Sequence, residues 1–98
     1  MNLELGDIGT EIYFENDLVK VWNLVLSPGQ SSAWHQHFNE YLFTVTRAGI
    51  LLVEYENGRE EEKEYALGQV VMGQKNSVHR VTNIGKALYS NSIVELKE

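Results

Sequence analysis

The stretch Pro28-Gly29-Gln30-Ser31-Ser32-Ala33-Trp34-His35-Gln36-His37-Phe38-Asn39-Glu40-Tyr41 carries a His-x-His pair at positions 35 and 37. In an extended chain, side chains two residues apart lie on the same face, about 6–7 Å apart along the strand. Both imidazoles are therefore expected to face one point. The third histidine of the sequence, His79, lies far along the chain in another short segment of β-branched residues. The pattern predicts a β fold that brings three imidazoles around one metal ion.

The length of 98 residues predicts one domain, 1–98, in which residues 1–10 are a lead-in or an edge strand. The composition, with 43% apolar and 10% aromatic residues, is that of a globular protein, and no segment is apolar for long enough to cross a bilayer. The first residues lack the basic start and the apolar block of a secretory signal. We expect a cytoplasmic protein without a membrane partner.

Cysteine is absent, so a metal site in this chain must be built from nitrogen and oxygen ligands. The net charge of −6 argues against nucleic acid as a partner, because binding a phosphate backbone needs clustered Lys and Arg. Glu60, Glu61, Glu62 and Glu64 lie nearly side by side in the sequence. We interpret this acidic run as a solvated face that discourages pairing at a sheet edge.

Short β-like segments, separated by Gly, Asn, Pro or Ser, follow one another along the chain. The predicted strands are Glu11–Glu15, Val19–Leu26, Ser32–Phe38, Tyr41–Arg47, Ile50–Glu56, Glu60–Ala66, Gln69–Met72, His79–Asn83 and Ala87–Leu96. Asn57-Gly58 is the strongest hairpin signal, since both residues tolerate the positive φ of a type I′ turn. Val19–Leu26 is apolar on both faces and is expected to be a central strand. Strands at this spacing predict an all-β sandwich or barrel such as a jelly roll.

Two motifs in this order resemble those of the cupin family. Gly29, five residues and His35-Gln36-His37 match the start of the first cupin motif. Gly68, five residues, Gln74-Lys75-Asn76, two residues, His79, three residues and Asn83 match the second. The resemblance covers about residues 19–96 and implies a cupin-like jelly-roll β-sandwich with a metal held by His35, His37 and His79.

The sequence departs from the family pattern at three places. Asn76 replaces a glycine, although Asn also adopts the left-handed conformation readily. Gln74 replaces a proline and loosens the same corner. The carboxylate of the first motif is displaced, because Glu40 lies one position early. Strict alternation turns Glu40 away from the histidines and Tyr41 toward them, unless a β-bulge rotates Glu40 inward.

Glu40 and Tyr41 are nevertheless the predicted catalytic residues, Glu40 also as a fourth ligand if a bulge is present. Tyr41 is expected to donate a hydrogen bond or shuttle a proton in the pocket, or else to pack in the core with its hydroxyl satisfied. The neighbours Trp34, Gln36 and Arg80 alternate outward. Asn83 is expected to fix a turn rather than contact a substrate.

Three neutral imidazoles leave the charge of a divalent ion uncompensated, which favours an anionic chelating substrate. Imidazole ligands suit Fe, Ni, Zn, Mn or Cu, and the resemblance leaves the metal open. The leading hypothesis is a metal-dependent enzyme, a dioxygenase, isomerase or lyase, that acts on a small oxygen-rich organic anion. The alternatives are a non-catalytic small-molecule-binding module and a structural jelly roll without metal.

The string Trp34-His35-Gln36-His37-Phe38-Asn39-Glu40-Tyr41 is similar to one in small cupins associated with β-alanine degradation. This similarity concerns a subgroup and does not identify a substrate. The family resemblance also implies a homodimer, as do Trp22, Trp34, Tyr13 and Phe14, which give a short chain apolar area to spare.

Overall fold

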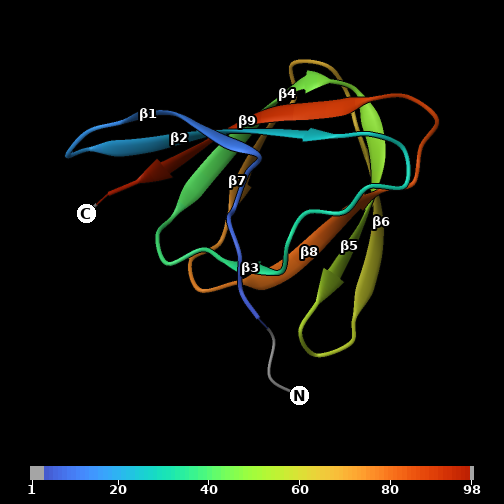
Figure 1. The fold of residues 1–98 in the computed structure, drawn as a ribbon, viewed down its shortest axis with the longest axis horizontal. Coiled ribbons are helices and arrows are strands. Elements are labelled where there is room, and N and C mark those ends of the chain that lie inside the picture. Colours follow the sequence, from blue (N-terminus) through green and yellow to red (C-terminus); the bar gives the residue numbers. More distant parts are fainter. Residues whose placement is uncertain (1–3, 98) are drawn as a thin grey trace.

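The fold is an antiparallel β-sandwich, described here for residues 4–97 of a computed structural model (Figure 1). Within this range the strands are β1 (Glu11–Glu15), β2 (Val19–Leu26), β3 (His35–Gln36), β4 (Tyr41–Arg47), β5 (Gly49–Tyr55), β6 (Glu60–Tyr65), β7 (Val70–Gly73), β8 (Val78–Asn83) and β9 (Tyr89–Leu96). One sheet has the order β1-β2-β9-β4-β7 and the other the order β3-β8-β5-β6. The all-β jelly-roll prediction is confirmed. In the described part of the chain no helix is long and apolar enough to cross a membrane.

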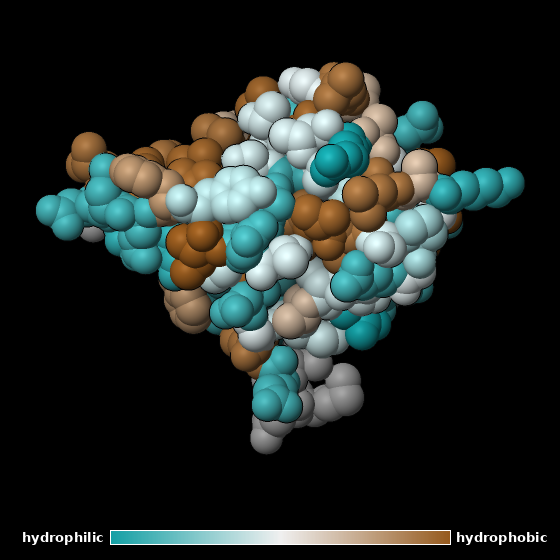
Figure 2. Space-filling view, turned by 45° about the horizontal axis from the view of Figure 1, so that its top comes forward, coloured by the Kyte–Doolittle hydropathy of each residue, from teal (hydrophilic) through white to brown (hydrophobic). Residues whose placement is uncertain are grey.

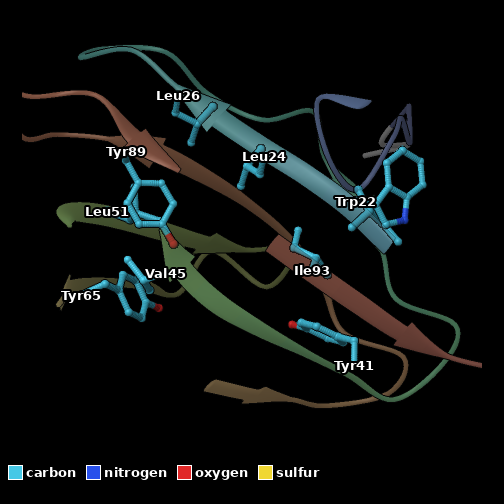
Figure 3. Close-up of a cluster of buried hydrophobic side chains, with 10 residues drawn as sticks. Trp22, Leu24, Leu26, Tyr41, Val45, Leu51, Tyr65, Tyr89 and Ile93 are labelled. Carbon is cyan, nitrogen blue, oxygen red and sulfur yellow. The ribbon is translucent and has the colours of Figure 1, made fainter. Parts of the chain in front are cut away.

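The core lies between the sheets, and β2 shows how the sequence fills it. Trp22, Leu24 and Leu26 are buried, whereas the residues between them are half-buried on the other face. This follows from the two-residue period of a strand. β2 lies between β1 and β9, as its apolar character predicts. Figure 3 shows these side chains packed with inward residues of β4 and β9, including Val45 and Ile93.

The β5–β6 hairpin has the predicted antiparallel pairing but a different turn. Only Gly58 has a positive φ, of 89°, and Asn57 does not, so the predicted type I′ turn is wrong. The Gly58 N–H donates to the Tyr55 carbonyl, and the Arg59 N–H donates to Asn57 Oδ1. This arrangement is that of a longer loop with one left-handed glycine. The Asn57 side chain takes up a backbone donor, which favours this loop over the two-residue turn.

The first histidine segment is less regular than predicted, since only His35–Gln36 of the expected strand 32–38 forms a ladder, with β8. Ahead of it, Ser32 Oγ accepts the Val81 N–H, and the Ser32 N–H donates to the Val81 carbonyl. The side chain thus replaces one backbone partner and ends the regular pairing. The corner before β8 survives the loss of glycine, because Asn76 adopts a φ of 69°. That prediction is confirmed.

The lead-in segment contains no strand over residues 4–10, and positions 1–3 lie outside the described residues. The Gly6 N–H donates to the Trp34 carbonyl at 2.7 Å, and the Thr10 N–H donates to the Asn23 carbonyl at 2.8 Å. Ile8 between them is buried in the core. The lead-in therefore runs across the sandwich and helps to close it.

Candidate metal centre

The three histidines meet because β3 pairs with β8. His35 lies directly opposite His79 in the register of these strands. His37, just beyond β3, is fixed by its backbone: its N–H donates to the Ser77 carbonyl at 3.1 Å, and its carbonyl accepts the Asn76 N–H at 2.6 Å. The ring centroids are 4.9 Å apart for His35 and His37, 4.6 Å for His35 and His79, and 5.1 Å for His37 and His79. The predicted cluster is present.

One potential ligand atom from each imidazole lies within 4.8 Å of the others. Two nitrogen ligands of one ion, each about 2.1 Å from it, are at most about 4.2 Å apart. Ring movements of the order of 1 Å therefore bring all three nitrogens onto one cation. The orientation of one ring is already set, because His35 Nδ1 lies 2.9 Å from the Ala33 carbonyl. A carbonyl only accepts, so Nδ1 carries the proton and Nε2 keeps its lone pair for a metal.

Burial keeps the three imidazoles neutral. It lowers the pKa of His37 to about 2, helped by repulsion from His35 and His79. It lowers the pKa of His79 to about 4, with smaller contributions from His35 and from the Lys63 ammonium. The pKa of His35 is lowered as well, chiefly by burial. Neutral imidazole is the form that binds metals, so the three histidines are in the form a metal requires at neutral pH.

The His37 ring also carries an unmet polar group. His37 is 1% exposed, and its Nδ1 has no hydrogen-bond partner. A buried polar atom without a partner costs about 1–3 kcal/mol, and most such atoms in folded proteins are satisfied. Three imidazole nitrogen donors, one of them on a ring whose Nδ1 lacks a hydrogen-bond partner, fit a divalent transition metal of the predicted kind. His35, His37 and His79 are the residues that would hold it.

Tyr41 lies beside this cluster on the opposite sheet. Its ring stacks on that of His37, with centroids 3.5 Å apart and planes within 12°. Its cross-strand neighbour is Gly73, where an added Cβ would overlap the Tyr41 ring. Glycine is therefore required there for the ring to lie flat. Burial raises the pKa of Tyr41, and a hydrogen bond with the Ser77 side chain offsets part of that rise, so the phenol is protonated at neutral pH.

Glu40 is placed outside this group. Its side chain is exposed, next to the buried Tyr41, as strict alternation along the strand predicts. β4 is irregular only between Val45 and Arg47, so no bulge turns Glu40 inward. Among the described residues the cluster contains no carboxylate. The buried Glu95 accepts a hydrogen bond from Trp22 Nε1 at 2.6 Å and belongs to the packing of β2 against β9.

A cavity of about 340 Å³ opens beside the histidines. His35 and His79 line it, together with a phenylalanine, three tyrosines, several aliphatic side chains and one buried amide. Among these residues are Phe43, Tyr41, Tyr55, Tyr65, Leu24, Leu51, Val53, Val81, Ile93 and Asn91. The exposed lining residues, Arg59, Met72 and Gln74, mark its mouth at the histidine end. The volume is at the small end of the range for ligand pockets.

Charged residues of β6 line the same cavity, and sequence reasoning missed them. Glu61 and Lys63 alternate with exposed glutamates and share the inner face with Tyr65. Glu61 pairs with Arg59 at 3.2 Å and with Lys63 at 3.4 Å. The side-chain period of two in a strand could have found them. Counted back from the apolar Tyr65, it places Lys63 and Glu61 on the inner face and the other glutamates on the outer face. The solvated-face interpretation holds for Glu60, Glu62 and Glu64 alone.

The remaining neighbours of the motifs have structural roles. The Arg80 guanidinium binds Glu54 through three hydrogen bonds of 2.9–3.1 Å and lies over the Trp34 ring, away from the histidines. Asn83 is 0% exposed and donates to the Leu26 and Ala87 carbonyls, while its Oδ1 accepts the Gly85 N–H. The prediction that Asn83 fixes a turn is confirmed.

Comparison with known proteins identifies the fold. No protein-family model and no curated protein matches the sequence. A cupin domain from Bordetella pertussis Tohama I is similar in structure, with 24% identity and a TM-score of 0.84 over 90% of this chain and 91% of that one. An RmlC-like cupin family protein with a double-stranded β-helix fold from Methanocaldococcus jannaschii gives 15% identity and a TM-score of 0.72 over 99% and 90% of the two chains.

A cupin superfamily protein from Desulfitobacterium hafniense DCB-2 gives 12% identity and a TM-score of 0.67, covering 96% of this chain and 84% of that one. The resemblance inferred from the two motifs is thus confirmed at the level of the fold, which is the fold of these cupin domains. The cupin fold together with the three-histidine cluster fits a metal-binding cupin.

Proposed function

We propose that this protein is a metal-dependent enzyme that acts on a small oxygen-rich organic anion at the three-histidine site, as a dioxygenase or as an isomerase or lyase. The observation that carries the proposal is the cluster of His35, His37 and His79, whose ligand atoms lie within 4.8 Å of one another beside a cavity. A bound Fe, Ni, Zn, Mn or Cu ion would supply Lewis acidity and, for a redox-active metal, electron transfer.

The charges around the cavity support an anionic substrate. Three neutral ligands cancel none of the charge of a divalent ion, and the described cluster contains no carboxylate. Arg59 and Lys63 both lie on the cavity wall and share the single carboxylate of Glu61. An incoming carboxylate that competes with Glu61 gains two cationic partners. Such pairing strengthens where water is partly excluded.

Within this function Tyr41 is the proposed proton donor. Its phenol is buried, lines the cavity and stacks on a ligand ring, so its position is fixed relative to the site. Because burial raises its pKa, the hydroxyl holds its proton at neutral pH and is able to donate it, or a hydrogen bond, to an oxygen of the bound ligand. The catalytic role predicted for Glu40 has no such support, since its side chain is exposed.

A second function is a small-molecule-binding module without turnover. It is favoured by the shortage of general bases among the described residues of the cavity wall, where Glu61 is the carboxylate present and is paired with Arg59 and Lys63. This module would bind the same class of anion at the same site.

Elemental analysis of the freshly isolated protein, purified without an affinity tag, tests the metal site. We expect about one transition metal per chain and a lower melting temperature after chelation, because metal binds the folded chain alone.

Oxygen uptake by iron-loaded protein with a panel of small carboxylates would indicate a dioxygenase. Turnover by zinc-loaded protein without oxygen uptake would indicate an isomerase or lyase. Binding without turnover would favour the module, and neither metal nor a chelation effect would favour a structural jelly roll.

We also propose a homodimer, with β1 in the interface. β1 is an edge strand with all five residues exposed, among them Ile12, Tyr13 and Phe14 at 49%, 60% and 54%. Figure 2 shows hydrophobic surface at the left, where β1 and β2 project, interspersed with hydrophilic groups. Sedimentation should give a dimer for the native chain and a monomer for Phe14→Glu. The cytoplasmic location expected from the sequence stays a prediction.

A further inference from the structure

Asn91 is a buried amide on the inner wall of the cavity. It is 3% exposed and lies on β9 between Leu24 of β2 and Val45 of β4. Tyr41, at the histidine end, pairs with Glu95 of the same strand, four residues further on. Four residues of a strand span about 13 Å. Asn91 therefore lies well inside the cavity, away from both the mouth and the metal ligands.

One end of this amide is anchored and the other is free. Asn91 Nδ2 lies 2.8 Å from the hydroxyl of Tyr89, whereas Oδ1 has no hydrogen-bond partner and is buried. Tyr89 is 0% exposed, and burial raises its pKa, so it remains a neutral hydroxyl. Rotating the amide by 180° exchanges its oxygen and nitrogen and again leaves one of them without a partner. In either orientation the cavity faces an unmet hydrogen-bonding group.

The Tyr89 hydroxyl accounts for one polar atom of this amide, but nothing in the described surroundings pairs with the other. The nearest positions on the inner faces of β2 and β4 are the apolar Leu24 and Val45. The next inward residue of β9, Ile93, is apolar as well. An unpaired buried amide atom destabilises a fold, whereas leucine has the same branching at Cγ and carries no polar atom. Figure 3 shows Tyr89 and Tyr65 at one end of the core cluster and Tyr41 at the other, so Asn91, next to Tyr89, belongs to the inner end.

We propose that Asn91 is a substrate-binding residue that hydrogen-bonds a hydroxyl group at the inner end of an elongated organic acid. The inference rests on the proposed function for the outer end of that ligand, at the histidines and the cationic pair Arg59 and Lys63. A hydroxyl fits because it both donates and accepts and so satisfies either atom of the amide. The cavity volume of about 340 Å³ limits the ligand to a small molecule.

The test uses matched pairs of acids, straight-chain carboxylates of four to eight carbons with and without a terminal hydroxyl, whose binding to metal-loaded protein is measured by calorimetry. At the best chain length we expect the native protein to bind the hydroxylated acid about tenfold more tightly than its partner, and Asn91→Leu to lose this preference. A native protein with no preference at any length, or a preference that survives in Asn91→Leu, would overturn the inference.

Two further measurements keep the result interpretable. Asn91→Leu leaves the Tyr89 hydroxyl unpaired, so the double variant with Tyr89→Phe, which removes both polar partners, is measured alongside it and should also lack the preference. Metal content is determined on the same samples. If the native protein takes up no metal but still prefers the hydroxylated acid, the proposed metal function fails while this inference stands. If metal binds and the preference is absent, the inference fails alone.

Discussion

The two ends of β8 carry inward polar side chains of opposite character, the buried Asn83 and the half-buried His79. At one end Asn83 uses its amide fully, in three hydrogen bonds to the backbone of Leu26, Gly85 and Ala87. At the other end His79 lies in a group of imidazoles that includes the unpartnered Nδ1 of His37. His79 and Asn83 both belong to the second cupin-like motif, in which three residues separate them.

The Asn83 amide stabilises the fold, whereas the histidine cluster contains a buried polar atom without a partner and destabilises it. A satisfied buried amide stabilises a corner, whereas a cluster of desolvated imidazoles destabilises the empty protein and gains its partner only with a ligand. In the proposed function, the histidine end is thus the part of the sandwich where a cost in stability accompanies ligand binding. Substitutions and pH should affect the two ends in different ways.

Acid should have the largest effect, and it should act through the histidine end. The unfolded chain takes up protons near pH 6.5, while folded His37 and His79 have pKa values of about 2 and about 4, so stability is full above pH 6.5 and falls as the pH drops. For the metal-free protein we expect a loss of about 2.7 kcal/mol per pH unit below about pH 6. Urea unfolding between pH 7 and 5 measures it.

A matched variant sharpens the acid experiment. His79→Phe removes one of the three imidazoles whose pKa burial lowers, so the dependence of the unfolding free energy on pH should fall by about a third to a half. Saturating divalent metal should move the onset of acid unfolding to lower pH, because it binds the neutral imidazoles. If the metal-free native protein were equally stable at pH 7 and pH 5, the histidines would not be the cause of acid unfolding.

At the other end of β8, Asn83→Leu should destabilise the fold by about 3 kcal/mol or more. It removes the partner of the buried Leu26 carbonyl and the partners of the half-buried Ala87 carbonyl and Gly85 N–H. Urea unfolding at pH 7 checks this value. The control is Asn57→Ala in the exposed β5–β6 loop, where one turn hydrogen bond is lost and we expect less than about 1 kcal/mol. Similar losses in the two variants would remove the distinction drawn for Asn83.

His79→Ala should have the reverse profile, a large effect on metal binding and a small one on folding. Losing one of three ligands should weaken metal affinity at least about 100-fold, or about 2.8 kcal/mol. Competition with a chelator of known affinity measures the change, and circular dichroism should show unchanged β content. Gln36→Ala, beside His35 but facing outward, is the control and should bind metal normally. Unchanged affinity in His79→Ala would reject the three-histidine site.

Glu40→Gln should have the smallest effect, since its side chain is exposed and lies outside the cluster. We expect stability to change by less than about 0.5 kcal/mol and metal affinity to stay the same. The same chelator competition and urea titration apply. A tenfold loss of metal affinity would show that Glu40 reaches the metal in solution, as the family resemblance implies for an acidic residue near this position.

The parts of the site that sequence reasoning found are those governed by alternation and motif spacing. His35 and His37 had to share a face, and Glu40 and Tyr41 had to lie on opposite faces, because a strand has a period of two. Glu61 and Lys63 obey the same rule, and they were missed because a run of charges was interpreted as one solvated face. The Asn57-Gly58 turn was predicted wrongly because the Asn57 side chain bonds to the backbone.

By itself the sequence determined the all-β class, the three histidines that cluster and the turn role of Asn83, since each of these depends on local spacing and residue chemistry. The tertiary structure alone decided which inward residues share a cavity. It brought Lys63 of β6 near His79 of β8 and placed Asn91 of β9 on the same inner wall. The register between strands distant in the chain fixes such contacts, and that register results from packing the two sheets together rather than from any one segment.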